Sequence, residues 1–160
     1  MAPAALKSKK RFGGGVLEPT HFIDIQFSEP KSEGQMAVLK EAQIIEGFEG
    51  LRLDYDRLQA AFQILKYTEK IAQEELGGNE DLFRLLGHAL KTLQSCKDPR
   101  SLVSHFEIKI LYFMGVLELE NSLRDVLARR FEDNVIIDEV TLSEEAFYKL
   151  GVSKREYLES

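Results

Sequence analysis

The sequence has 160 residues, of which 44% are hydrophobic and 30% are charged, so it can bury the core of one soluble domain, with or without an appendage. Its net charge of −6 is unevenly distributed, because the first 17 residues carry four cations and no acid. The remainder carries 17 basic and 27 acidic side chains, which disfavours a protein coated in nucleic acid. A single cysteine excludes an internal disulfide and a zinc site built from several cysteines.

The sequence also favours a cytoplasmic protein without a membrane segment. No apolar run reaches the roughly 18 residues that a membrane-spanning helix requires. Glycines follow the basic N-terminal residues, where a signal peptide would have its hydrophobic segment.

Residues 1–15 are expected to form a basic flexible segment. Its candidate DNA-binding side chains are Lys7, Lys9, Lys10, Arg11 and Phe12. Cations beside an aromatic ring are typical of surfaces that follow a phosphate backbone and stack bases, whereas a solvated tail is the alternative. Four phosphate contacts predict a slope of about −3 for log K against log salt on single-stranded DNA. The three following glycines lack the frame of a phosphate-binding loop and are interpreted as a joint.

Residues 16–47 are predicted to form a β-hairpin. Apolar and polar residues alternate from Thr20 to Phe27, as in a half-buried strand, and a second extended run covers Met36 to Ile45. Pro30 and Gly34 mark the turn between them. Because an isolated two-stranded hairpin is only marginally stable, it is expected either to pack on another part of the protein or to find further strands. Its unpaired edge could recruit those strands from another copy of the chain.

Residues 48–160 are predicted to form a helical domain. Apolar residues at helical spacing predict a first helix from about 53 to 76, with its inner face formed by Leu58, Ala61, Phe62, Leu65, Ala72 and Leu76. Asn79 should cap a second helix, and Asp98 followed by Pro99 should begin a third. Short connections predict antiparallel packing of these three helices. The predicted fold class is therefore α+β, mainly α: a helical bundle with an N-terminal β-hairpin.

The C-terminal part is expected to contain another helix from about 119 to 130, a short β-prone run at 135–140, and two short helices. Capping boxes at Thr141 and Ser153, with Gly151 between the helices, suggest where the last two begin. This final stretch also resembles a helix-turn-helix, although Phe147 stands where close packing normally requires a small residue.

No arrangement of residues in the sequence supports catalysis or a cofactor. His21, His88 and His105 fall on separate predicted elements and lack the spacing of metal ligands. The prediction is a protein that is not an enzyme, with no cofactor and no metal.

Several stretches together resemble the bacterial RecO family of recombination mediators. They are the basic segment through Gly14, Leu17-Glu18-Pro19, the strand from Phe22 to Phe27, the run from Leu39 to Phe48, and Phe106-Glu107 with Leu111 and Gly115. The resemblance covers about 110 residues. It implies an N-terminal oligonucleotide-binding barrel joined to a helical domain, with single-stranded DNA, a RecR-like protein and single-strand-binding protein as partners in the RecF-type pathway.

Two departures from that family pattern stand out. The match begins near residue 7, so the hairpin would be what is left of a truncated barrel, whose fold needs five strands. The four-cysteine element of many relatives is absent, because the chain has one cysteine.

The resemblance also suggests a protein-binding groove in the helical domain. An acidic peptide ending in an aromatic residue, such as the tail of single-strand-binding protein, could bind between helices, with Lys91, His105 and Lys109 supplying positive charge. Ser104 and His105 stand where the family has an arginine before Phe-Glu. The alternatives are that His105 is a surface residue and Phe106 a core residue, and that the whole chain is a helical interaction or structural module without DNA binding.

Overall fold

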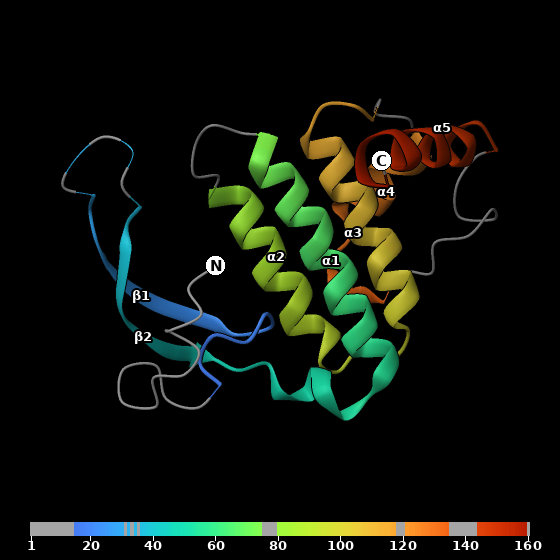
Figure 1. Ribbon diagram of the computed structural model, residues 1–160. Helices are drawn as coiled ribbons and strands as arrows, with labels where there is room; N and C mark the ends of the chain where they lie inside the picture. The colour runs from blue at the N-terminus through green and yellow to red at the C-terminus, as the bar shows by residue number, and fades with distance from the viewer. Residues whose placement is uncertain are drawn as a thin grey trace. The chain divides into compact units, whose positions relative to one another are not determined.

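The computed structural model of the chain describes residues 15–30, 32, 34, 36–74, 80–117, 121–134 and 144–159. It divides into two compact units, Met1–Phe48 and Glu49–Ser160. The elements, shown in Figure 1, are β1 (Phe22–Ser28), β2 (Val38–Glu46), the 3-10 helix η1 (Glu49–Leu53), α1 (Tyr55–Glu74), α2 (Glu80–Leu93), α3 (Pro99–Phe113), α4 (Asn121–Ala128), the 3-10 turn η2 (Phe131–Asp133), α5 (Glu144–Lys154) and the π-helical turn η3 (Arg155–Glu159). The predicted class, mainly helical with a β-hairpin, is confirmed.

The first unit contains the predicted antiparallel hairpin. Strand β1 pairs with β2, with Ile25 opposite Ala42 and Phe27 opposite Leu39. The register shifts at two places, and each shift inserts one extra residue into β2, Lys40 and Ile45. In the described part of the chain, this sheet has two strands.

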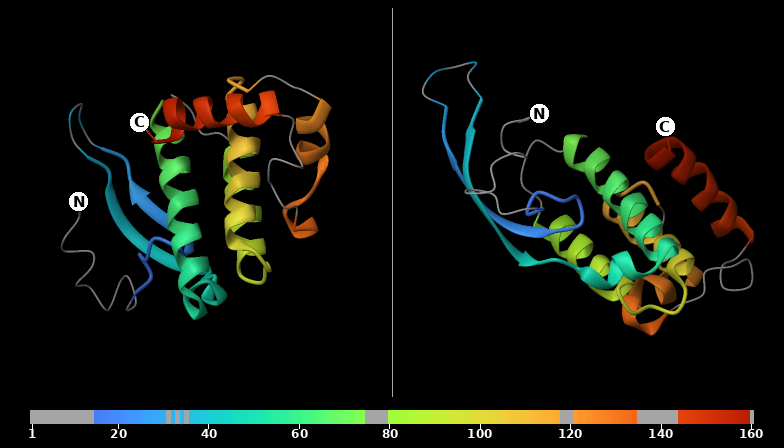
Figure 2. Two further views of the ribbon diagram at one scale, coloured as in Figure 1. Left: turned by 90° about the vertical axis from the view of Figure 1, so that its right-hand side faces the viewer. Right: turned by 60° about the horizontal axis from the view of Figure 1, so that its bottom comes forward.

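The second unit is built on α1, α2 and α3, which pack against one another. Figure 2 shows α1 and α3 side by side, with α5 running across them. The predicted start of α3 is confirmed, because Asp98 accepts hydrogen bonds from the backbone N–H groups of Arg100 and Ser101, and Pro99 occupies the first turn.

The buried face of α1 differs from the predicted one by about one residue. Ala61 is buried as predicted, but Phe62 is 47% exposed. The buried stripe runs instead through Ala60, Ile64, Tyr67 and Ile71. Alanine and tyrosine occur on both the buried and the exposed faces of amphipathic helices, so they do not identify the buried face from sequence. Packing against α3 determines which face of α1 is buried.

Helix α3 is buried over most of its circumference. Its buried side chains include polar ones, and the full set is Leu102, Val103, His105, Phe106, Glu107, Ile108, Ile110 and Leu111. The interpretation of His105 as a surface residue is therefore wrong, whereas the placement of Phe106 in the core is confirmed. An apolar residue on nearly every side is typical of a central helix rather than a one-sided surface helix.

The C-terminal part contains one continuous helix in place of the predicted pair. Helix α5 passes through Gly151 and Ser153, and η3 follows it directly. Leu150 to Ser153 are therefore helical, so the helix-turn-helix interpretation and the predicted start at Ser153 are both wrong. The predicted helix near residues 119–130 is confirmed as α4.

Several sequence predictions lie outside the described residues. They are the basic side chains Lys7, Lys9, Lys10 and Arg11 with Phe12, the Asn79 cap, the run at 135–140 and the capping box at Thr141.

Within the described ranges, no helix is long and apolar enough to cross a membrane.

Candidate partner-binding groove

A cleft of about 790 Å³ lies in the helical unit between α2, α3 and the segment that follows α4. Its lining residues are Asp81, Arg84, Leu85, His88, Lys109, Leu127, Ala128, Arg129, Arg130, Phe131 and Glu132. On α2 they recur every three or four positions, which places them on one face of that helix. The opposite wall comes from α3 and from the end of α4.

A second cleft of about 630 Å³ shares Asp81, Leu85, Lys109 and Leu127 with the first. It adds Tyr112, Phe113 and Gly115 from the end of α3. The two clefts therefore adjoin, and we call them together the α2–α3 groove. It has a charged end beside Arg129 and an aromatic end beside Phe113, with Lys109 at the junction.

The charged end of the groove is predominantly basic. Arg84, Lys109, Arg129 and Arg130 line it together with two carboxylates, those of Asp81 and Glu132. Arg129 and Arg130 are exposed and directly follow α4, whereas Arg84 is paired with Glu80 across 2.7 Å on the surface of α2. The groove is thus a local basic region on a helical unit that belongs to an acidic chain.

His105 and Lys109 hold the wall of this groove in place by capping α4. The carbonyl oxygens in the last turn of a helix have no partner within that helix. The Nε2 of His105 lies 3.0 Å from the oxygen of Val126, and Nζ of Lys109 donates to the oxygen of Leu127 at 2.8 Å. A carbonyl oxygen only accepts, so Nε2 of His105 carries the proton. The negative end of the α4 dipole also stabilises the positive charge of an ammonium group at this position.

Phe131 completes the support beneath the groove. Its ring meets that of His105 edge to face, with centroids 5.0 Å apart, and Nζ of Lys109 lies 5.6 Å from its centroid. Burial, and then the positive charge of Lys109, lowers the pKa of His105 to about 4, so the imidazole is neutral at neutral pH. Burial likewise lowers the pKa of Lys109.

Comparison with curated proteins gives a consistent result. The chain is 34% identical over 119 residues to the DNA repair protein RecO of Desulfosudis oleivorans, and 34% identical over 115 residues to that of Syntrophus aciditrophicus. The RecO protein of an Exiguobacterium species is 28% identical over 116 residues. These matches cover 72–74% of the chain. The chain belongs to the RecO family.

The chain spans less than half the length of the RecO proteins that it matches, between 43% and 45% of each of these three. No model of a protein family matches the chain, and no solved structure matches it significantly.

The residues that the RecO resemblance suggested for partner binding occupy three different environments. Lys109 lines the groove, but its ammonium group is already engaged with α4. Lys91 is exposed on α2, one turn beyond His88, and is not part of the lining. His105 is buried and neutral, so it contributes no charge to a bound ligand, which corrects that part of the prediction.

Three of the cationic residues that line the α2–α3 groove, Arg84, Arg129 and Arg130, were not predicted as site residues. Arg84 lies in the middle of α2, and Arg129 and Arg130 directly follow the C-terminal end of α4. The signal in the sequence was weak, because a pair of arginines at a helix terminus is also common in proteins without a site. Only the packing of α4 against α3 brings them opposite Arg84.

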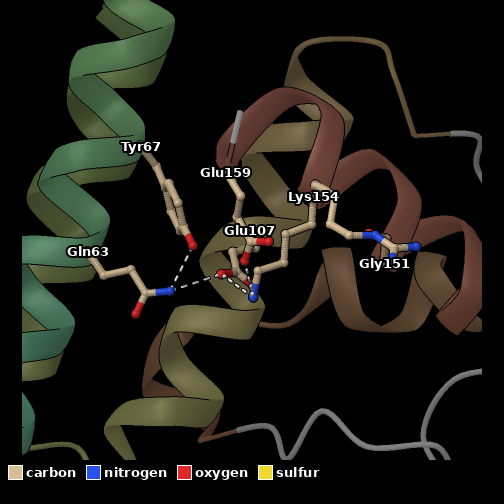
Figure 3. A network of polar contacts seen from close by, with 7 residues as sticks. Gln63, Tyr67, Glu107, Gly151, Lys154 and Glu159 are labelled. Atoms are coloured by element: carbon tan, nitrogen blue, oxygen red, sulfur yellow. Dashed lines mark hydrogen bonds and ion pairs between the residues drawn. The ribbon is translucent and has the colours of Figure 1, made fainter.

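The Phe106-Glu107 pair that carries the RecO resemblance is fully inside the helical unit. Figure 3 shows Glu107 between α1 and α5: Nζ of Lys154 lies 3.0 Å from its Oε1, and Nε2 of Gln63 lies 3.4 Å from the same oxygen. Gln63 also donates to the hydroxyl of Tyr67 at 2.7 Å. These contacts join α5 to the other two helices.

Burial raises the pKa of Glu107 despite the nearby ammonium group. Burial alone would lower the pKa of Lys154, but the pair with Glu107 outweighs it and the pKa is raised. The carboxyl group is the more buried partner, which explains why desolvation prevails for Glu107 and not for Lys154.

No cluster of residues that could hold a metal ion occurs in the part of the chain that the structure describes. Cys96 is buried, and burial raises the pKa of its thiol, which suppresses the thiolate form that reacts.

Proposed function

We propose that the chain is an accessory protein of DNA repair and recombination whose helical unit recruits a partner protein through the α2–α3 groove. The observation that carries the proposal is the groove itself: basic at one end, aromatic at the other, in a chain of the RecO family. The relatives are named as DNA repair proteins, which supports the pathway. Such a role would operate in the cytoplasm, where the bacterial chromosome lies.

The chemistry of the groove fits an acidic segment that ends in an apolar residue. Carboxylates of the segment would pair with Arg129 and Arg130, and the terminal side chain would lie among Leu85, Tyr112 and Phe113. The acidic tail of single-strand-binding protein, which the family resemblance suggests as a partner, has this character. A RecR-like protein is the second partner implied by the resemblance.

A nucleic-acid strand suits this groove less well than a peptide. A phosphate backbone would gain nothing from the apolar end of the groove, beside Leu85, Tyr112 and Phe113, whereas an apolar side chain of a peptide could be buried there. We therefore assign single-stranded DNA binding to the basic segment that contains Lys7, Lys9, Lys10, Arg11 and Phe12. In this proposal, the hairpin corresponds to the last two strands of the oligonucleotide-binding barrel of the family.

A peptide titration tests the recruitment proposal. A fluorescein-labelled peptide of four aspartates followed by leucine and a C-terminal phenylalanine should bind the full chain in fluorescence anisotropy. The Arg129→Ala/Arg130→Ala variant should bind at least about tenfold more weakly, because two charge-assisted hydrogen bonds are lost. Lys66→Ala, an exposed change on α1, is the matched control and should bind normally.

Equal binding by the wild type and the arginine variant would contradict the proposal. A peptide of the same composition with phenylalanine at its N-terminus shows whether binding requires the aromatic residue at the C-terminus. Undiminished binding of that peptide would also contradict the proposed use of the groove.

The DNA assignment is tested separately with labelled oligo-dT. Affinity should fall with added salt, with a slope of about −3, and should be lost when Lys7, Lys9, Lys10 and Arg11 are changed to alanine. If that variant binds oligo-dT unchanged, the basic segment is not the DNA site. If the wild type does not bind at all, the chain is a helical interaction module without DNA binding.

A further inference from the structure

The hairpin has an apolar face that is exposed over much of its area, although Ala42 on this face is buried and Ile23 and Leu39 are half-buried. Cross-strand pairing places Ile23 with Ile44, Ile25 with Ala42, and Phe27 with Leu39 on this face. Ile25, Phe27 and Ile44 are each at least 45% exposed. The opposite face is polar at its centre, where the amide of Gln43 donates to Asp24, and has Phe22 and Val38 towards its two ends. A two-stranded sheet with such a face gains stability from further strands or from packing against a helix.

The two strands differ in how well their outer edges are protected against pairing. Strand β2 carries two extra residues, one of which is Lys40, and bulges and lysines keep edge strands from pairing. Strand β1 reads Phe-Ile-Asp-Ile-Gln-Phe-Ser and contains no lysine, proline or glycine. Its central stretch, residues 23–27, is therefore the part of the sheet best suited to receive another strand.

The same stretch is complementary to itself in antiparallel orientation. When Ile25 lies opposite Ile25 of a second copy, Ile23 lies opposite Phe27 of that copy and Asp24 lies opposite its Gln26. Every apolar side chain then meets an apolar one, and no like charges face each other. A two-fold axis through Ile25 keeps the apolar face of both copies on the same side of the joined sheet.

We propose that two copies of the chain associate by antiparallel pairing of their β1 strands about Ile25, which forms a four-stranded sheet in the order β2-β1-β1-β2. The bulged β2 strands then lie at both outer edges, so the assembly closes at two copies. The dimer is independent of the α2–α3 groove and adds an assembly to the proposed recruitment function.

Cysteine cross-linking tests this register. In a Cys96→Ser background, Ile25→Cys puts two thiols on directly opposite residues, about 5 Å apart between Cα atoms, which is within disulfide range. Ile23→Cys lies on the same face of the same strand, but its two copies are about 14 Å apart along the strand. Oxidation with copper phenanthroline should therefore give a covalent dimer for the first variant and little for the second.

Light scattering after size-exclusion chromatography gives the second measurement. The wild-type chain should have the mass of a dimer at about 100 μM, and Ile25→Lys should reduce it to a monomer. The helical unit reports whether the variant is otherwise folded, since its circular dichroism should be unchanged.

Three outcomes would overturn the proposal. One is a wild-type chain that is monomeric at this concentration. Another is equal cross-linking of the Ile23→Cys and Ile25→Cys variants, which indicates random collision. The third is dissociation by Ile44→Lys with no cross-link at position 25, which indicates that two apolar faces stack and the edges do not pair.

Discussion

His105 donates a hydrogen bond from α3 to the oxygen of Val126 at the end of α4, and its ring is packed against Phe131. The imidazole is neutral in the folded protein, because its pKa of about 4 is well below the ordinary value of 6.5. Unfolding restores that ordinary value, so the unfolded chain binds the additional proton between pH 6.5 and pH 4. The free energy of unfolding should therefore fall as the pH is lowered through this window.

The variant His105→Gln should remove this part of the pH dependence. Glutamine has an N–H donor at a comparable position but does not titrate, and a shift from 6.5 to about 4 corresponds to roughly 3 kcal/mol. Urea unfolding between pH 7 and pH 4 should show the variant losing less stability than the wild type, by up to about that amount. His88→Gln, on the exposed part of α2, is the control; parallel curves for the wild type and His105→Gln would contradict the assignment.

Lys154 neutralises the buried carboxylate of Glu107. Lys154→Met should lower the free energy of unfolding by about 1 to 3 kcal/mol at pH 7, because it leaves a buried charge without its ion-pair partner. The loss should shrink as the pH falls, because protonation of Glu107, whose pKa is already raised, removes the unpaired charge. Urea unfolding at two pH values measures both effects.

Two further variants show whether the effect comes from the pair. Adding Glu107→Gln to Lys154→Met should recover most of the stability, since no charge is then left buried. Lys149→Met removes a more exposed ion pair of the same helix, with Glu145, and should cost no more than about 0.5 kcal/mol. Similar losses for Lys149→Met and Lys154→Met would indicate a general effect of charge on α5.

At the level of elements, α5 is where local sequence signals and the structure disagree most. Gly151 followed by Ser153 has the sequence of a turn and a new cap, yet both residues lie within the helix. Tertiary contacts favour the continuous helix, because the Lys154 side chain reaches Glu107 only if the chain remains helical to that point.

Gly151→Ala distinguishes a helix from a turn at this position. In a helix, alanine should raise stability by about 0.5 to 1 kcal/mol, and a Cβ at Gly151 would meet no atom within 4 Å. A destabilised Gly151→Ala variant in thermal or urea unfolding would indicate the turn instead. Gly50→Ala provides the contrast and should destabilise, since its Cβ would lie 3.0 Å from Cβ of Gln94.

The elements that were predictable from sequence are those with strong local signals. Alternation identified β1, and the Asp98-Pro99 pair identified the start of α3. Burial of Tyr67 and Ile71 on α1, and of His105 and Glu107 on α3, could not be predicted, because each depends on which helix packs against which face. Periodicity describes one apolar stripe, whereas α3 is surrounded by α1, α2, α4 and α5.

At the scale of the whole molecule, family membership was accessible from the sequence, but the groove was not. Family motifs are contiguous in sequence, and Phe106-Glu107 with its spaced leucine and glycine can be read directly. The groove combines α2, α3 and the residues after α4, which are far apart in the chain. Lys109 was predicted for a charged role and lies in the lining, but Arg84, Arg129 and Arg130 join it only through the fold.

The central claim is that the α2–α3 groove binds an acidic segment of a partner, and an amide chemical-shift titration of the ¹⁵N-labelled chain tests it most directly. With the aspartate-rich peptide described above, the largest shifts should fall on Arg84, His88, Lys109 and residues 127–131, with smaller ones at Tyr112 and Phe113. Shifts concentrated on the exposed face of α1 or on the hairpin, or none at a millimolar excess of peptide, would contradict the claim.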